Sequence, residues 1–261
     1  MIKSDNFTYK VIKFPCGEIS IKVKYAHFSE SVDIMFDFEK LEELTELFLL
    51  CHTIRLDGIK LSLLLIKYMP FGREDRKESC GKSFALKWFC EQINNLRFDN
   101  VEIIDPHSDV AAALINNVCV IKQHTLFENF LSDQKAEQKD FYLVAPDAGA
   151  LKKVYKLAKI VNPLGVVECS KVRDIETGDI SRTAVHADDL QGEDCYLVDD
   201  ICDGGRTFLE AAKVLKTKNA GKINLLVTHG KFTKGLKVLD NFIDNIYSID
   251  LVGNIVKLTQ K

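Results

Sequence analysis

The residues best suited to chemistry form one acidic, glycine-rich segment. Asp199 and Asp200 stand side by side at the end of a short apolar run. Five residues continue the segment: Asp203, Gly204, Gly205, Arg206 and Thr207. Apolar residues then recur at helical spacing, which predicts a strand-to-helix turn. Such a turn offers backbone N–H groups to a phosphate, and the carboxylates suit ribose hydroxyls or a bridging Mg²⁺. A solvated turn capped by Asp203 is the alternative, and the glycines and the helix favour the phosphate site.

Two further turns carry the same kind of residues. Asp147, Ala148 and Gly149 follow an apolar run and precede a helical pattern, so they repeat the order carboxylate, small residue, glycine, helix. A helix cap at Asp147 is the alternative. His107 follows Asp105 at the end of another apolar run, where a metal or phosphate role competes with a plain surface position.

Two charged segments follow apolar runs. Arg73, Glu74 and Asp75 begin a loop rich in both charges, which suits a nucleotide or polyphosphate. Lys171 and Arg173 follow another run, and cations near phosphates are what phosphoryl transfer requires. For each segment taken in isolation, a solvated, salt-bridged loop is the favoured alternative.

Alternating strand and helix patterns must position these residues. Eleven strands are predicted, at residues 9–14, 18–24, 31–36, 60–67, 101–105, 118–122, 142–145, 165–169, 196–198, 224–228 and 245–249. Six helices are predicted, at residues 38–52, 82–96, 110–115, 148–159, 206–216 and 234–239. The alternation indicates an α/β protein with mostly parallel sheets, whose ligands bind beyond the carboxyl ends of the strands.

A polar stretch at residues 132–140 is the best candidate for a domain boundary. It divides the chain into α/β halves of similar size. We expect an N-terminal domain over residues 1–135 and a C-terminal domain over residues 136–261.

Composition excludes several classes of protein. The 261 residues are 46% hydrophobic, and the net charge of −3 comes from well-mixed charges, so a nucleic-acid partner is not expected. No apolar run is long enough to span a membrane. Eight scattered cysteines without a Cys-x-x-Cys pair argue against structural zinc and for reduced thiols, and the first residues carry no apolar secretory core. We expect a cytoplasmic protein.

Seven segments together resemble ribose-phosphate pyrophosphokinases, the enzymes that make phosphoribosyl pyrophosphate (PRPP). They occur in the family's order, at residues 14–19, 73–77, 105–108, 146–150, 171–173, 199–207 and 228–233. The chain would be a short, divergent member of that family. The resemblance implies two similar, Rossmann-like domains of the phosphoribosyltransferase type, with the ATP loop and oligomer contacts in the first. It also implies a homo-oligomer, either a dimer or a hexamer of dimers.

The implied activity is transfer of a diphosphoryl group from Mg-ATP to ribose 5-phosphate, giving PRPP and AMP. The resemblance assigns ATP binding to five residues: Phe14, Glu18, Arg73, Glu74 and Asp75. It makes Lys171, Arg173 and His107 catalytic, with His107 and Asp147 at the Mg²⁺. The loop at residues 147–149 would hold pyrophosphate. Asp199 and Asp200 would hold the ribose hydroxyls, and residues 203–207 the 5-phosphate.

Four positions depart from the family's pattern. Cys16 replaces an aspartate, Glu74 a glutamine, Gly204 a threonine and Arg206 a glycine. Arg206 either adds a phosphate contact or crowds the pocket. Two alternatives remain: a phosphoribosyltransferase that consumes PRPP, and a synthase-like regulatory subunit without catalysis. The Arg73 loop and the two α/β halves argue against the first, while Lys171, Arg173 and His107 argue against the second.

Overall fold

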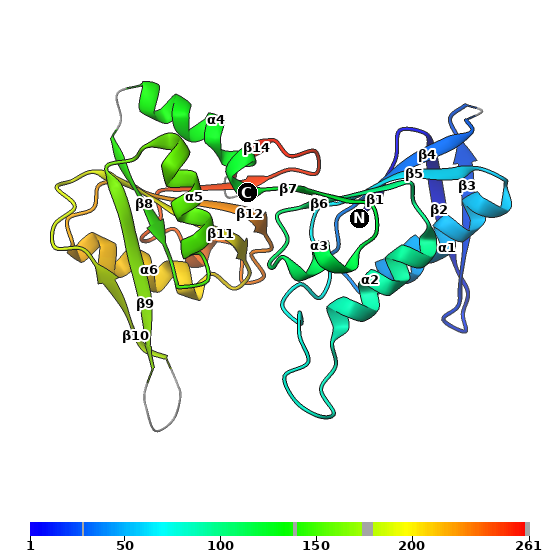
Figure 1. Cartoon of the computed structure of the whole chain (residues 1–261), viewed down its shortest axis with the longest axis horizontal. Helices are drawn as coiled ribbons and strands as arrows, with labels where there is room; N and C mark the ends of the chain where they lie inside the picture. The colour runs from blue at the N-terminus through cyan, green and yellow to red at the C-terminus, as the bar shows by residue number, and fades with distance from the viewer. Residues whose placement is uncertain (28, 138–139, 174–179, 259–261) are drawn as a thin grey trace. The chain divides into compact units, whose positions relative to one another are not determined.

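The structure, a computed structural model, describes residues 1–27, 29–137, 140–173 and 180–258. The side chains of residues 171–173 and 180–182 also lie outside the description. The chain divides into two compact units, Met1–Ile121 and Lys122–Lys261. Each is an α/β unit built on a mostly parallel sheet, which confirms the predicted fold class (Figure 1).

The first unit contains a five-stranded sheet in the order β1-β4-β5-β6-β7. Its strands are β1 (Ile2–Lys3), β4 (Ser31–Phe36), β5 (Lys60–Ile66), β6 (Asn100–Ile104) and β7 (Val118–Ile121). β4 to β7 run parallel, and their connections contain α1 (Glu42–Leu56), α2 (Ala85–Leu96) and α3 (Val110–Leu114). Because β5 and β6 are neighbours, the loop after β5 and the turn after β6 leave the same edge of the sheet.

Apolar periodicity explains the helices of this unit. On α2 the buried residues recur at helical spacing: Leu86, Phe89, Cys90, Ile93 and Leu96. They join the sheet in one core, where each buried Leu, Ile or Phe contributes about 2 kcal/mol. A separate antiparallel hairpin of β2 (Phe7–Lys13) and β3 (Ile19–Tyr25) carries residues 14–18 at its tip, where Gly17 adopts φ +90°.

The second unit contains a seven-stranded sheet in the order β10-β9-β8-β11-β12-β13-β14. The five parallel strands are β8 (Phe141–Ala145), β9 (Gly165–Arg173), β11 (Asp194–Cys202), β12 (Ile223–Gly230) and β13 (Asn245–Ile249). The edge strands β10 (Ile180–His186) and β14 (Ile255–Leu258) are antiparallel to their neighbours. Helices α4 (Gln123–Ala136), α5 (Leu151–Val161) and α6 (Arg206–Thr217) complete the unit.

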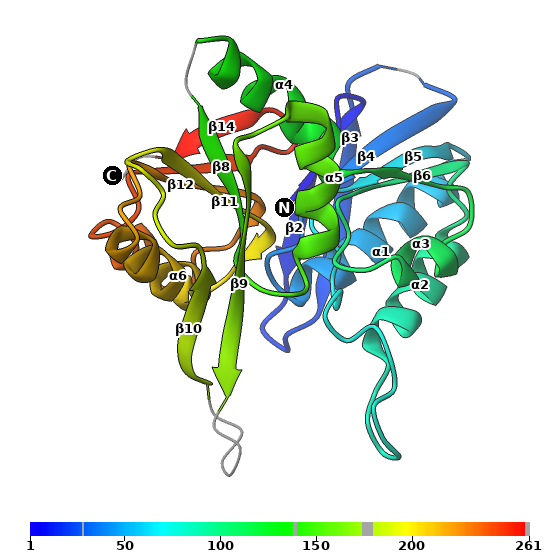
Figure 2. The same ribbon diagram turned by 60° about the vertical axis from the view of Figure 1, so that its left-hand side comes forward.

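Alternate residues of the strands face two separate cores. In β11, Cys195 and Leu197 pack with α6, whereas Tyr196 and Val198 pack with α4 and α5. Successive side chains of a strand point to opposite faces, so the two helix layers cover the two faces of the sheet (Figure 2). From Cys195 to Val198, β11 therefore carries apolar side chains on both faces, and the acidic pair begins at Asp199.

The structure differs from the expected elements in several places, and α4 and the strands β1, β10 and β14 were not predicted. The polar stretch at residues 132–140 begins inside α4, and Phe127 and Leu131 of that helix are fully buried in the second unit. The compact units therefore meet after Ile121 rather than after residue 135. The predicted helix at 234–239 is wrong: only a 3₁₀ turn, Leu236–Val238, forms there, between Gly235 in the left-handed region and the buried Leu239.

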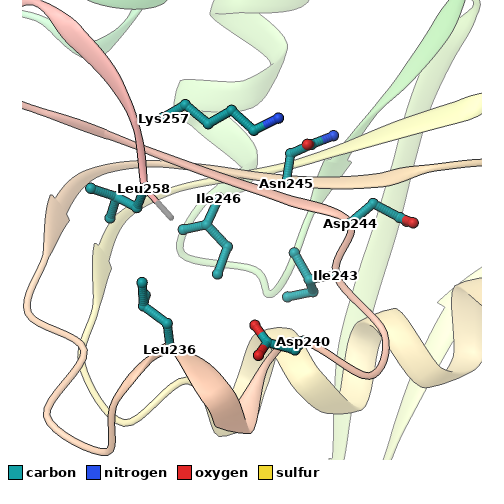
Figure 3. Close-up of a pocket in the computed structure, with 8 residues that line it drawn as sticks. All are labelled: Leu236, Asp240, Ile243, Asp244, Asn245, Ile246, Lys257 and Leu258. Atoms are coloured by element: carbon teal, nitrogen blue, oxygen red, sulfur yellow. The ribbon is translucent and has the colours of Figure 1, made fainter. Parts of the chain in front are cut away.

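A pocket of ≈ 250 Å³ lies in the second unit at the amino end of β13 (Figure 3). Leu236, Ile243 and Ile246 contribute its apolar lining. Asp244 accepts a hydrogen bond from the Ile223 N–H (2.7 Å) and pairs with Lys216 (3.3 Å), so its carboxylate braces the fold. None of the predicted site residues lines this pocket, and ligands of parallel sheets bind at the other ends of the strands.

Candidate active site

The strand order of the second unit places its acidic turns together. From β8 the chain passes through α5 to β9 on one side, whereas from β11 it passes through α6 to β12 on the other. The connections thus diverge between the neighbouring strands β8 and β11, which is the point where open α/β sheets bind ligands. The Asp147 turn follows β8, and the Asp199 segment ends β11.

Asp199 and Asp200 are consecutive in β11, and their carboxyl groups lie close enough to interact. Asp200 is only 6% exposed, and its carboxylate lies 3.4 Å from Lys153 Nζ of α5. The carboxylate of Asp199 accepts a hydrogen bond from the backbone N–H of Asp200 (2.8 Å). The two carboxyl groups are therefore fixed by different partners before any ligand is bound.

Three carboxyl groups share this site. Burial raises the pKa of Asp199 well above its ordinary value, and the neighbouring charges of Asp200 and Asp147 raise it further. Concentrated negative charge of this kind favours a ligand that brings hydroxyl donors or a cation.

The turn after Asp200 leads into α6 through a demanding backbone. Gly205 adopts φ +76°, and an added Cβ there would lie 2.9 Å from Leu239 Cδ2. Only glycine fits both constraints. Arg206 and Thr207 then open α6, with no acidic residue in its first turn, so their N–H groups and the helix dipole present positive potential.

A second loop braces this turn. Asp203 accepts hydrogen bonds from the Thr233 hydroxyl (2.8 Å) and, through its backbone carbonyl, from the Thr233 N–H (3.1 Å). The Lys231 and Phe232 N–H groups donate to the Cys202 carbonyl. The segment at residues 228–233 therefore supports the phosphate turn, and the Asp203 carboxylate holds this loop in place.

The Asp147 turn is compact and open to solvent. The Asp147 carboxylate accepts a hydrogen bond from the Gly149 N–H (3.0 Å), and its carbonyl accepts one from the Ala150 N–H (3.2 Å). Ala148 and Gly149 are exposed. Asp147 thus closes the turn without capping α5, whose N-cap is Ala150, and lies near enough to Asp199 to affect its pKa.

In the first unit, the loop after β5 lies against the turn after β6. A Cβ placed on Gly72 would be 3.5 Å from the His107 Cβ. Arg73, Glu74 and His107 are exposed, and Asp75 pairs with Arg76 at 3.4 Å. The structure therefore brings Arg73 and Glu74 into the neighbourhood of His107, although 34 positions separate residues 73 and 107.

The remaining predicted residues lie elsewhere. Phe14, 46% exposed, and Glu18 sit at the tip of the β2–β3 hairpin, where the Phe14 N–H donates to the Glu18 carbonyl. The backbones of Lys171 and Arg173 belong to β9, and their side chains lie outside the described residues. β9 and β10 form a long antiparallel ribbon (Figure 1).

Sequence reasoning missed Lys153, which contacts the acidic pair. It is one of four lysines on α5, and no local pattern separates it from Lys152, Lys156 and Lys159. Only the packing of α5 against β11 reveals which of them reaches Asp200.

The described residues contain no group of three or more His, Cys, Asp or Glu side chains that could hold a metal ion. The carboxyl groups at the ends of β8 and β11 fit Mg²⁺ as one or two ligands that act together with substrate phosphates. No helix in the described ranges is long and apolar enough to cross a membrane.

An acidic pair and a glycine turn at a helix N-terminus, at the point where strand connections diverge, define an α/β domain that binds a phosphorylated sugar or nucleotide. The chain belongs to the phosphoribosyl transferase domain family, whose model matches residues 120–257. That match covers the second unit with both acidic turns.

Relatives with known names are similar to this chain over the first unit as well. A ribose-phosphate pyrophosphokinase of Saccharolobus solfataricus is 27% identical over 83% of this chain and 76% of its own. One from Pyrococcus abyssi is 26% identical over 97% and 90%. The crystal structure of phosphoribosylpyrophosphate synthetase from Mycobacterium smegmatis matches with a TM-score of 0.77 and 18% identity, covering 94% of this chain and 80% of that one. The resemblance to the pyrophosphokinases is thus confirmed, and the last structure shares the fold.

Proposed function

We propose that this protein is a ribose-phosphate diphosphokinase, which transfers a diphosphoryl group from ATP to ribose 5-phosphate. The observation that carries the proposal is the pair of turns after β8 and β11, one fit for diphosphate and one for a sugar phosphate. The first unit adds the charged loop beside His107. The two pyrophosphokinases named above match 83% and 97% of this chain.

The sugar binds at the end of β11. Asp199 and Asp200 accept hydrogen bonds from the ribose 2- and 3-hydroxyls, and the N–H groups from Gly205 to Thr207 hold the 5-phosphate. Arg206 adds a cation to this cradle. The fixed positions of both carboxylates leave the anomeric hydroxyl free to react.

The anomeric oxygen attacks the β-phosphorus of ATP. The new bond joins that oxygen to the β-phosphorus, the hydroxyl proton is released to solvent, the bond from the β-phosphorus to the α,β-bridging oxygen breaks, and AMP leaves with that oxygen. Lys171 and Arg173 neutralise the charge that develops on the transferred group, and residues 147–149 receive the diphosphate. ATP is held in the first unit by Arg73, Glu74 and Asp75. Its adenine base is contacted by Phe14 and Glu18.

Mg²⁺ belongs to this proposal as the partner of ATP, where it would neutralise phosphate charge. Asp147 in the second unit and His107 in the first are each proposed to contact Mg²⁺, as the family resemblance implies. The hairpin tip with the exposed Phe14 supports a homo-oligomer in which it reaches a neighbouring subunit. Eight free cysteines support a reducing, cytoplasmic location.

The decisive experiment measures AMP formation by purified protein supplied with ATP, ribose 5-phosphate and Mg²⁺. Formation that requires all three is the expected result. Absence of turnover by folded protein contradicts the proposal.

The family match favours one second candidate, a phosphoribosyltransferase. It predicts that PRPP and a base are consumed without ATP. A regulatory subunit instead predicts no turnover alone and a changed activity of an added synthase.

A further inference from the structure

The lysine that meets the acidic pair lies at an electrostatically unfavourable place on its helix. Lys153 occupies the first turn of α5, which contains no acidic residue. A cation at a helix N-terminus opposes the helix dipole and costs a few tenths of a kcal/mol. Packing already anchors α5, because Val154, Leu157 and Val161 are buried against the sheet.

The contact of Lys153 is specific and partly buried. Its Nζ lies 3.4 Å from Asp200 Oδ2, and the two side chains are 27% and 8% exposed. The helix that carries Lys153 starts directly after the Asp147 turn, and the strand that carries Asp200 ends at the sugar-binding turn. One ion pair therefore connects the two halves of the candidate site.

The charges around Asp200 show why a cation is needed there. Asp199 is its neighbour in the chain, and both Asp147 and Asp200 act electrostatically on Asp199. Without Lys153, the buried Asp200 carboxylate would lose an ion-pair partner, and the repulsion from its acidic neighbours would be less compensated.

We propose that Lys153 is a positioning residue, which holds the Asp200 carboxylate in the orientation that accepts hydrogen bonds from the ribose hydroxyls. This inference rests on the proposed function of the acidic pair. In this role Lys153 acts on the sugar through Asp200, which it contacts at 3.4 Å. Its loss should weaken ribose 5-phosphate binding while leaving ATP binding intact.

The test compares Lys153→Met with Lys156→Met, since Lys156 lies on the exposed face of the same helix. We expect Lys153→Met to raise the KM for ribose 5-phosphate by about tenfold or more, because small misplacements of a binding group are costly. The KM for ATP should change by less than about twofold, and Lys156→Met should resemble the wild type. Lys153→Arg keeps the charge and should recover most of the loss.

Two results would overturn the inference: equal KM values for ribose 5-phosphate in Lys153→Met and Lys156→Met, or a parallel loss for both substrates. Calorimetric titration with ribose 5-phosphate separates this inference from the proposed function. If the wild type binds the sugar without turnover and Lys153→Met binds it more weakly, the positioning role stands and the proposed reaction fails. If the wild type does not bind the sugar, both fail.

Discussion

The proposed sugar-binding turn of the second unit and the charged loop of the first unit are built in opposite ways. The turn after β11 is braced by Thr233, by the Lys231 and Phe232 amides and by Lys153. In the loop after β5, Arg73 and Glu74 are exposed, and the ion pairs Asp75–Arg76 (3.4 Å) and Glu78–Lys82 (3.3 Å) join residues that are close in sequence.

Substitutions in the two regions should therefore have different effects on folding and on binding. A residue in the braced turn contributes to folding and to binding together, because its contacts exist before the ligand arrives. A residue in the exposed loop contributes when a ligand binds, and its removal leaves the fold unchanged.

The largest effect on folding is expected for Gly205→Ala. The added Cβ meets Leu239 at 2.9 Å and the backbone keeps φ +76°, so we expect a loss of about 2–4 kcal/mol from strain and overpacking. Urea unfolding followed by far-UV circular dichroism measures it. Gly204→Ala is the control, because its Cβ would make ordinary 3.6 Å contacts with Lys234. Equal midpoints for the two variants would remove the argument for a braced turn.

The largest effect on activity without loss of stability is expected for Arg73→Ala. Removal of a cation beside the polyphosphate should lower AMP formation by about 10²-fold. The melting temperature should stay within about 1 °C, because exposed substitutions change stability little. Lys87→Ala, an exposed change on α2, is the control. A fall in melting temperature would show that the loop is braced after all.

The acidic pair should show a conflict between binding and stability. Asp199 has a raised pKa in the folded protein, so between the unfolded value near 3.9 and the folded value the folded state binds the proton more tightly. Stability attributable to Asp199 is therefore lost as pH rises through this window.

Asp199→Asn removes that titration. We expect it to melt a few degrees above the wild type at pH 8, since ~1 kcal/mol corresponds to roughly 2–4 °C for a chain of this size. The advantage should vanish below about pH 4. AMP formation should be abolished. Asp188→Asn, an exposed change, is the control, and a destabilised Asp199→Asn protein would refute the electrostatic explanation.

Local signals made most of the fold and the acidic turn predictable. The apolar run of β11 ends directly at Asp199, and the helix face of α6 begins directly after Arg206, so neighbouring residues define the strand, the turn and the helix. The strand at residues 245–249 is observed with the predicted bounds for the same reason.

Contacts between distant segments could not be predicted in this way. α4 was missed because its apolar residues form a short stripe beside a polar stretch, and only the second unit's core shows how they pack: Leu126, Phe127, Phe130 and Leu131. Lys153 reaches Asp200 across 47 positions, and Thr233 reaches Asp203 across 30. Such pairs depend on how strands and helices pack, which residue spacing does not encode.

The smallest expected effect tests this last contact. Thr233→Val preserves the shape of the side chain and removes the hydroxyl that donates to Asp203, which should cost about 1 kcal/mol. Because the backbone bond from the Thr233 N–H remains, we expect the turn to persist and the KM for ribose 5-phosphate to rise by about two- to fivefold, with the KM for ATP unchanged. The control is Thr217→Val, whose exposed hydroxyl donates within α6. If the two valine variants have equal KM values for the sugar, the brace holds the fold alone and does not position the phosphate turn.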